Sequence, residues 1–268
     1  MFSRPIVHTA RSSLRSSLLG SQHVAALRRV AAGAAPRAAA VNAGNRASFF
    51  STSVSTKNEA KTQLHEVLSQ ELKFEESDAF GLDESFKTYL NENNIEIVKT
   101  DGKVLAELVK KTPTENIHIY FDILRISQTS YQLKQMQEQV ENSEYLEDEI
   151  ADIAFADVNV VIVKDKKATG FDLSLSLIDS SFSVSAITNF EDAKLALDES
   201  PEASAVRDLK YSGPEFNNLA EELQEAINQY LNSRGIDNAL ADFILAYSGV
   251  KENNEYLDWL DSLKKFTA

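Results

Sequence analysis

Runs of alternating apolar and polar residues fill the middle of the chain. In NIHIYFDILRI, the residues Ile117, Ile119 and Phe121 share one face, and FDLSLSL repeats the same period of two. Such alternation is typical of strands that bury one face. The turns between successive runs are short and polar, and parallel pairing would require crossover helices between them. The pattern therefore predicts an antiparallel meander.

Turn signals separate the predicted strands. Asp101 and Gly102 lie between two alternating runs, which is a typical hairpin signal. Counted from Phe86, the chain has about seven predicted strands, and the last is a short run from Val206 to Tyr211. We therefore expect an α+β fold, built on an about seven-stranded, twisted antiparallel sheet with helices at both ends of the chain.

Helical spacing is found near the two ends. Thr56 and Glu59 have capping-box spacing at the start of a helix predicted over residues 57–76. Two or three helices are predicted near the C-terminus, where Gly235 would end one helix and Asp237 would cap the next. The apolar stripes of the first and last helices are predicted to pack on each other and on a neighbouring subunit. These stripes contain Leu64, Val67, Leu68, Leu72, Tyr256, Trp259, Leu260, Leu263 and Phe266.

Residues 127–150 interrupt the strand pattern with glutamine, glutamate and few apolar residues. We expect a long exposed acidic loop there, helical only transiently. One interpretation is a solvated loop that charge keeps soluble, and the other is a docking surface for basic partners. A second acidic connection precedes residue 206. The candidate partner-binding residues are Glu141, Glu144, Glu147, Asp148, Glu149, Asp152, Asp198, Glu199 and Glu202.

The first 58 residues contain no carboxylate, although the whole chain has a formal net charge of -14. Seven arginines and many serines and alanines make this segment typical of a mitochondrial transit peptide. A basic amphipathic helix is drawn to a negatively polarised compartment, and carboxylates would oppose that movement. We therefore predict a cleaved transit peptide over residues 1–52 and a single domain over 53–268 in the mitochondrial matrix. That domain has 41 acidic and 20 basic residues.

Several classes of site are excluded or lack support in the sequence. The chain has no cysteine, which excludes disulfides, zinc thiolates, iron–sulfur clusters and cysteine nucleophiles. Motifs for nucleophile elbows, dinucleotides, phosphates and metals are missing. Of the histidines in the predicted domain, His65 is expected on the surface and His118 packed or paired on a strand. We expect no catalytic residue, no cofactor, no membrane span and, because of the acidic charge, no direct nucleic-acid binding.

The C-terminal stretch resembles the family of mitochondrial acidic matrix proteins, which includes the animal complement component 1q subcomponent-binding protein. The matching residues are Arg234, Gly235, Ile236, Asp237, Ala241, Asp242, Glu255, Tyr256, Leu260, Leu263, Lys264 and Phe266. The resemblance implies a seven-stranded twisted sheet, flanked by terminal helices, in a ring-shaped homotrimer. It also implies a non-enzymatic matrix protein that supports mitochondrial ribosome assembly, translation and respiration.

Three kinds of function remain open at this stage. The first is an acidic adaptor or chaperone for basic proteins, ribosomal proteins and translation factors among them. Because one exposed ion pair contributes only about 0 to 1 kcal/mol, such binding needs many carboxylates together. The second is an enzyme that uses carboxylates, which a concave site with perturbed acids would identify. The third is a weak buffer for calcium or other cations.

Overall fold

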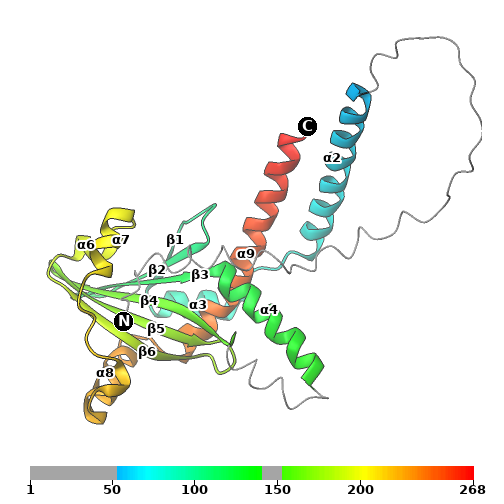
Figure 1. Ribbon diagram of the computed structural model, residues 1–268. Coiled ribbons are helices and arrows are strands. Elements are labelled where there is room, and N and C mark those ends of the chain that lie inside the picture. Colours follow the sequence, from blue (N-terminus) through cyan, green and yellow to red (C-terminus); the bar gives the residue numbers. More distant parts are fainter. Residues whose placement is uncertain (1–52, 141–152) are drawn as a thin grey trace, which may run out of the picture.

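A computed structural model describes residues 53–140 and 153–268 of the chain (Figure 1). The predicted transit peptide therefore lies outside the described residues. The fold is α+β, as predicted, and its strands form one antiparallel sheet in which each strand pairs with the next along the chain. The strands are β1 (Ile95–Val98), β2 (Leu105–Lys111), β3 (Asn116–Asp122), β4 (Phe155–Lys164), β5 (Lys167–Ser176) and β6 (Ser181–Phe190).

The described residues form six strands rather than about seven. The run from Val206 to Tyr211, predicted as the last strand, instead includes the end of helix α7 (Pro201–Asp208) and the loop after it. The Ser200 hydroxyl caps this helix by accepting a hydrogen bond from the Ala203 amide at 3.2 Å. A proline in the first turn adds to this preference. Local helix signals thus outweigh a short alternating run.

The strands also begin later than predicted. Phe86 lies in helix α3 (Glu84–Glu92), and the first strand starts at Ile95. The Asp83 carboxylate caps α3 by accepting a hydrogen bond from the Ser85 amide at 2.8 Å. This capping aspartate is the local signal that marks the helix in the sequence.

The predicted exposed connection over residues 127–150 is in large part a helix. Helix α4 (Ile123–Val140) follows β3 directly and packs against α9 (Asn238–Phe266). Its buried side includes Ile126 and Leu133, seven residues apart on one helical face. The prediction was wrong here because a narrow apolar stripe suffices to seat a helix that is otherwise rich in glutamine. The rest of the predicted loop, residues 141–150, lies outside the described residues.

Helix α9 crosses one face of the sheet, which we call the first face, and packs on it to complete the main core. Phe243 of α9 is fully buried and stacks on Tyr247, with ring centroids 5.6 Å apart. The strands add inward-facing residues, and their alternation agrees with the predicted pattern. These core residues are Ala106, Leu108, Ile117, Ile119, Phe121, Val158, Val160, Ile162, Phe171, Leu173, Leu175 and Val184. The second face of the sheet carries the intervening residues.

The turn between α8 (Glu221–Asn232) and α9 follows the sequence prediction. Gly235 adopts a positive φ of 80°, which favours glycine at a helix end. The Ile236 amide donates to the Leu231 carbonyl at 3.1 Å. The Asp237 carboxylate then accepts from the Leu240 amide at 3.1 Å and caps α9. The C-terminal region therefore has two long helices, with the short helix η2 (Phe216–Asn218) before them.

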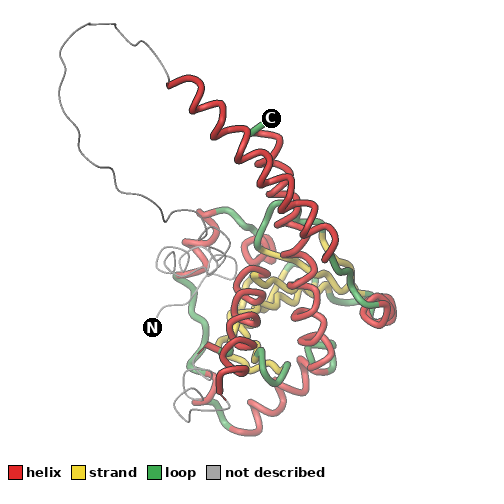
Figure 2. The backbone as a smooth tube through the Cα atoms, turned by 90° about the vertical axis from the view of Figure 1, so that its right-hand side faces the viewer, coloured by secondary structure: helices red, strands yellow, loops and turns green. Residues whose placement is uncertain are grey.

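The second half of α9 leaves the sheet and runs beside α2 (Ser53–Asp78), as both views show (Figure 1 and Figure 2). The Lys61 ammonium donates to the Ala268 carbonyl at 2.6 Å, and His65 Nδ1 lies 3.2 Å from the Lys264 carbonyl. The start of α2 thus lies beside the end of α9, so the two helices are antiparallel. We call α2 with residues 256–266 the helical arm. None of the described helices is both long and apolar enough to cross a membrane.

Candidate partner-binding surface

The predicted acidic surface is described only in part. Asp198, Glu199 and Glu202 are exposed and lie close together in sequence, around the start of α7. Asp198 accepts a hydrogen bond from the Ser200 amide at 2.8 Å, which lowers the pKa of its carboxyl group. Glu199 lies 3.3 Å from the Lys103 ammonium. The other predicted residues, Glu141, Glu144, Glu147, Asp148, Glu149 and Asp152, lie outside the described residues.

The second face of the sheet brings further carboxylates together. In the strand register, Glu107 lies opposite Tyr120, Tyr120 opposite Asn159, and Asn159 opposite Asp172. By the alternation of the strands, Asp122 and Asp157 point to this same face. We call this surface the acidic face. Its residues are Glu107, Tyr120, Asp122, Asp157, Asn159 and Asp172.

The acidic face is partly desolvated. Asn159 donates a hydrogen bond to the Asp172 carboxylate at 2.7 Å. Burial nevertheless raises the pKa of Asp172 to about 6, and the nearby charge of Asp157 acts in the same direction. Burial also raises the pKa of Asp122. A cation next to these groups would favour their charged forms, so the face is suited to a positive ligand.

Few basic side chains of the strands point to this face, although Arg207 of α7 lies near Tyr120 and the Lys210 ammonium lies over the Phe190 ring. Among the described residues of β2 to β6 that point to it, the only lysine or arginine is Lys111, whose ammonium lies 2.7 Å from Glu96. His118 Nδ1 is 2.8 Å from the Glu107 carboxylate, and its ring stacks on Tyr120. The prediction that His118 is packed or paired is therefore confirmed. In the described part of the chain, no three histidine, aspartate or glutamate side chains gather as metal ligands would.

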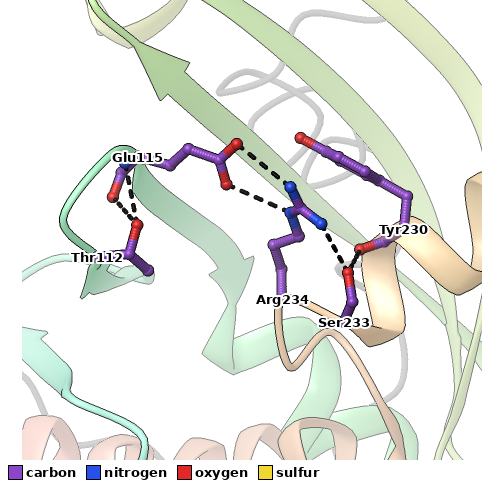
Figure 3. Close-up of polar contacts among 5 residues, drawn as sticks. All are labelled: Thr112, Glu115, Tyr230, Ser233 and Arg234. Atoms are coloured by element: carbon purple, nitrogen blue, oxygen red, sulfur yellow. Dashed lines mark hydrogen bonds and ion pairs between the residues drawn. The ribbon is translucent and has the colours of Figure 1, made fainter.

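The family-like motif near residue 234 has a structural role (Figure 3). The Arg234 guanidinium forms two bonds with the Glu115 carboxylate, from Nε at 3.3 Å and from Nη2 at 3.4 Å. It also lies over the Tyr230 ring, 3.7 Å from the centroid. Thr112 and Glu115 close the turn between β2 and β3. Arg234 therefore fixes the start of α9 against this turn.

A second family-like residue, Glu255, holds α9 at a later point along the helix, where it passes the turn between β1 and β2. Its carboxylate accepts from the Gly102 amide at 2.8 Å and from the buried Lys251 ammonium at 2.6 Å. The Lys251 ammonium also donates to the Thr100 carbonyl at 2.9 Å. These bonds attach α9 to the turn between β1 and β2. Arg234 and Glu255 thus help to specify how α9 lies on the sheet.

The predicted packing stripe of the helical arm separates into two parts. Leu68, Leu72 and Leu260 are buried between the two helices, as predicted, with Tyr256 and Leu263 packed beside them. The remaining residues of the prediction are exposed on the arm. These residues are Leu64, Val67, Trp259 and Phe266. Helical spacing alone does not show which side of an apolar stripe faces the partner helix.

Comparisons with known proteins agree with this architecture. The mitochondrial acidic protein mam33 of Schizosaccharomyces pombe is 26% identical over 220 residues, covering 79% of this chain and 80% of that protein. An uncharacterized mitochondrial protein of Arabidopsis thaliana is 34% identical over 58 residues, 22% of this chain and 23% of the relative.

Two solved structures share the fold. One is a hypothetical Leishmania major protein of unknown function, described as a sequence homologue of human p32, with a TM-score of 0.58 and 21% identity. The other is the Trypanosoma brucei p22 protein, with a TM-score of 0.58 and 23% identity. Both alignments cover 78% of this chain and 99% of the other. The family model MAM33, mitochondrial glycoprotein, matches residues 68–267, so this chain belongs to the MAM33 family of mitochondrial glycoproteins.

Proposed function

We propose that this chain is a non-enzymatic acidic protein that binds basic proteins as an adaptor or chaperone. The main support is the acidic face, where Glu107, Asp122, Asp157 and Asp172 lie on one sheet surface. Among the described strand residues that point to this face, Lys111 is the only lysine. Salt screens charges over about 8 Å at physiological ionic strength, so closely spaced carboxylates act jointly on a cationic segment.

The proposed location is the mitochondrial matrix, after removal of residues 1–52. The arginine-rich, acid-free start of the sequence supports import, and the Schizosaccharomyces pombe relative is itself named a mitochondrial acidic protein. Ribosomal proteins and translation factors are the proposed clients because they are basic and abundant where mitochondrial ribosomes assemble. In this proposal the chain supports mitochondrial translation and respiration through these clients.

Neutralising the acidic face should weaken the capture of a polycation. We expect the triple variant Asp122→Asn, Asp157→Asn, Asp172→Asn to bind poly-L-lysine about tenfold more weakly, because three ion pairs of about 0.5 kcal/mol each are lost. Titration calorimetry at low salt measures this change. About 0.5 M salt should release the polycation from the parent chain.

The matched control removes three carboxylates from α8, far from the acidic face in the sequence. The variant Glu221→Gln, Glu222→Gln, Glu225→Gln has the same net charge as the triple variant, and all three positions are exposed. We expect it to keep most of the affinity. Equal loss in both variants would mean that total charge, and not this face, determines binding. A parent chain that ignores poly-L-lysine at low salt would contradict the proposed function itself.

We further propose that three copies assemble into a ring through the helical arms. The exposed apolar residues Leu64, Val67, Trp259 and Phe266 support this assembly, because such a row gains free energy when a neighbour covers it. A ring would also multiply the acidic faces, and a polycation could then contact several at once.

A charge on the arm should disrupt the assembly. We expect the double variant Val67→Glu, Trp259→Glu to reduce the mass in solution from three chains to one. Assembly would bury the two new carboxylates at the contact between subunits, which is costly. Light scattering after size exclusion measures the mass. Leu209→Glu is the control, since this leucine is exposed after α7 and outside the arm. A parent chain that is already monomeric would contradict the proposal.

A further inference from the structure

Three large apolar side chains are exposed at the end of helix α7 and just after it. Val206 is 49% exposed, Leu209 88% and Tyr211 82%. We call these three residues the apolar patch. Helix α7 packs on α6 (Ala193–Leu197) at the end of the sheet away from the helical arm (Figure 1), so the patch is separate from the exposed residues of the arm. Clustered apolar side chains on a protein surface often mark a contact site.

The opposite side of α7 is fixed to the fold. Its buried residues are Ala203, Ser204 and Arg207. The Arg207 Nη1 atom donates to the Leu195 carbonyl at 2.9 Å and to the Asp198 carbonyl, at the end of α6 and just after it. Residues three apart share a side of a helix, so Val206 and Leu209 lie together on the side that faces solvent. The apolar side of α7 is therefore presented by an anchored helix.

The segment after α7 is also anchored, and its apolar residues remain outside. The Lys210 ammonium lies over the Phe190 ring of β6, 5.6 Å from the centroid. The Ile187 amide of β6 donates to the Ser212 carbonyl at 3.4 Å. Residues 210 and 212 thus contact the last strand of the sheet, while the two apolar neighbours, at 209 and 211, are exposed.

The apolar patch lies within an acidic stretch of the chain. Residues 198–215 contain five carboxylates and two basic residues. The carboxylates, all of them exposed, belong to Asp198, Glu199, Glu202, Asp208 and Glu215. Of the two basic side chains, Arg207 is buried and Lys210 lies on an aromatic ring of the sheet. Glu202 comes one turn before Val206 on the same side of α7. This combination fits an apolar partner that carries positive charge.

We propose that the apolar patch binds the apolar side chains of basic clients, so that this chain prefers cationic amphipathic segments to uniformly charged ones. The inference rests on the proposed capture of basic proteins and names the segments preferred. Helix α6 links the two surfaces, because its Ala193 and Ala196 pack with Tyr120 of the acidic face. A helix is about 10 Å wide, so one client segment can reach both surfaces. The carboxylates disfavour anionic membranes and a second, equally acidic copy of this chain as occupants.

Two peptides of equal positive charge test this preference on the full chain. Each has about twelve residues; one carries lysine and leucine at helical spacing, and the other has serine in place of every leucine. At low salt, fluorescence anisotropy should show that the parent binds the leucine peptide about tenfold more tightly, because apolar burial adds to the ion pairs. The double variant Leu209→Ser, Tyr211→Ser should lose this preference while its affinity for the serine peptide stays unchanged.

The matched control is Leu223→Ser with Tyr131→Ser, which removes the same residue types from exposed positions on α8 and α4 and should keep the preference. A parent that binds both peptides equally would overturn the inference but leave the proposed function intact. A parent that binds neither peptide would contradict the proposed function as well. A preference that survives in Leu209→Ser, Tyr211→Ser would place the leucine contacts elsewhere and also overturn the inference. So would a lower mass of that variant in light scattering, since a second copy would then cover the patch.

Discussion

Replacing Phe243 by alanine is expected to lower the free energy of unfolding by about 3 to 5 kcal/mol, the usual range for deleting a buried aromatic ring. The side chain is 0% exposed where α9 crosses the sheet. Its ring centroid lies 5.9 Å from that of Phe86, 6.0 Å from Tyr89 and 5.6 Å from Tyr247. These rings come from two helices and cannot move together to fill the cavity. Urea unfolding followed by circular dichroism measures the loss.

Trp259→Ala is the matched control, since it also removes a large aromatic ring from α9. This side chain is 57% exposed, although its place in an apolar stripe predicted packing. We therefore expect a loss of about 0.5 kcal/mol or less, as at most surface positions, when both variants are measured at concentrations too low for assembly. Similar losses at the two positions would mean that the arm contributes as much to the fold as the crossing of the sheet.

The sheet was largely predictable because strand alternation and turn chemistry are local signals. The six strands from Ile95 to Phe190 follow the period of two. Their order follows the chain, and their connections are short except between β3 and β4, where α4 intervenes. The end of α8 at Gly235 and the cap of α9 at Asp237 were predicted for the same reason, since a positive φ and a capping carboxylate depend on neighbouring residues. Features that depend on distant partners were predicted less well.

Helix α4 illustrates that limit. Its apolar stripe is narrow, and whether Ile126 and Leu133 are buried depends on α9, which lies more than one hundred residues later in the chain. The predicted seventh strand failed in a different way. A capping Ser200 followed by proline favours helix α7 over a short alternating run.

The candidate site was predicted only in part. The alternation placed His118, Tyr120 and Asp122 on one face of their strand, and they do share it. The neighbours of Tyr120 on that face, Glu107 and Asn159, come from β2 and β4, and only the strand register brings them together. A pattern within one strand gives the face on which each residue lies, but the residue opposite it on the next strand also depends on the geometry of the turn between the strands.

Asp172→Asn should make the chain more stable at neutral pH, by at most about 3 kcal/mol. Burial raises the pKa of Asp172 from 3.8 to about 6, so the folded chain retains a proton that the unfolded chain releases. The parent therefore loses stability as the pH rises from the unfolded pKa of 3.8 to the folded pKa of about 6, and the loss is complete above about pH 6. Asparagine cannot ionise and still accepts the Asn159 hydrogen bond. Urea unfolding between pH 4 and pH 7.5 measures the difference.

The expected difference between variant and parent is small near pH 4, grows up to about pH 6 and then stays constant. Asp157→Asn is the control because that residue is exposed, and it should give a much smaller change. A flat difference across the pH range would show that Asp172 is not desolvated in the folded chain. A charge kept at a cost to stability is expected where function needs it. Asp172→Asn should therefore bind poly-L-lysine more weakly while unfolding at higher urea, a combination that a purely structural role for Asp172 would not produce.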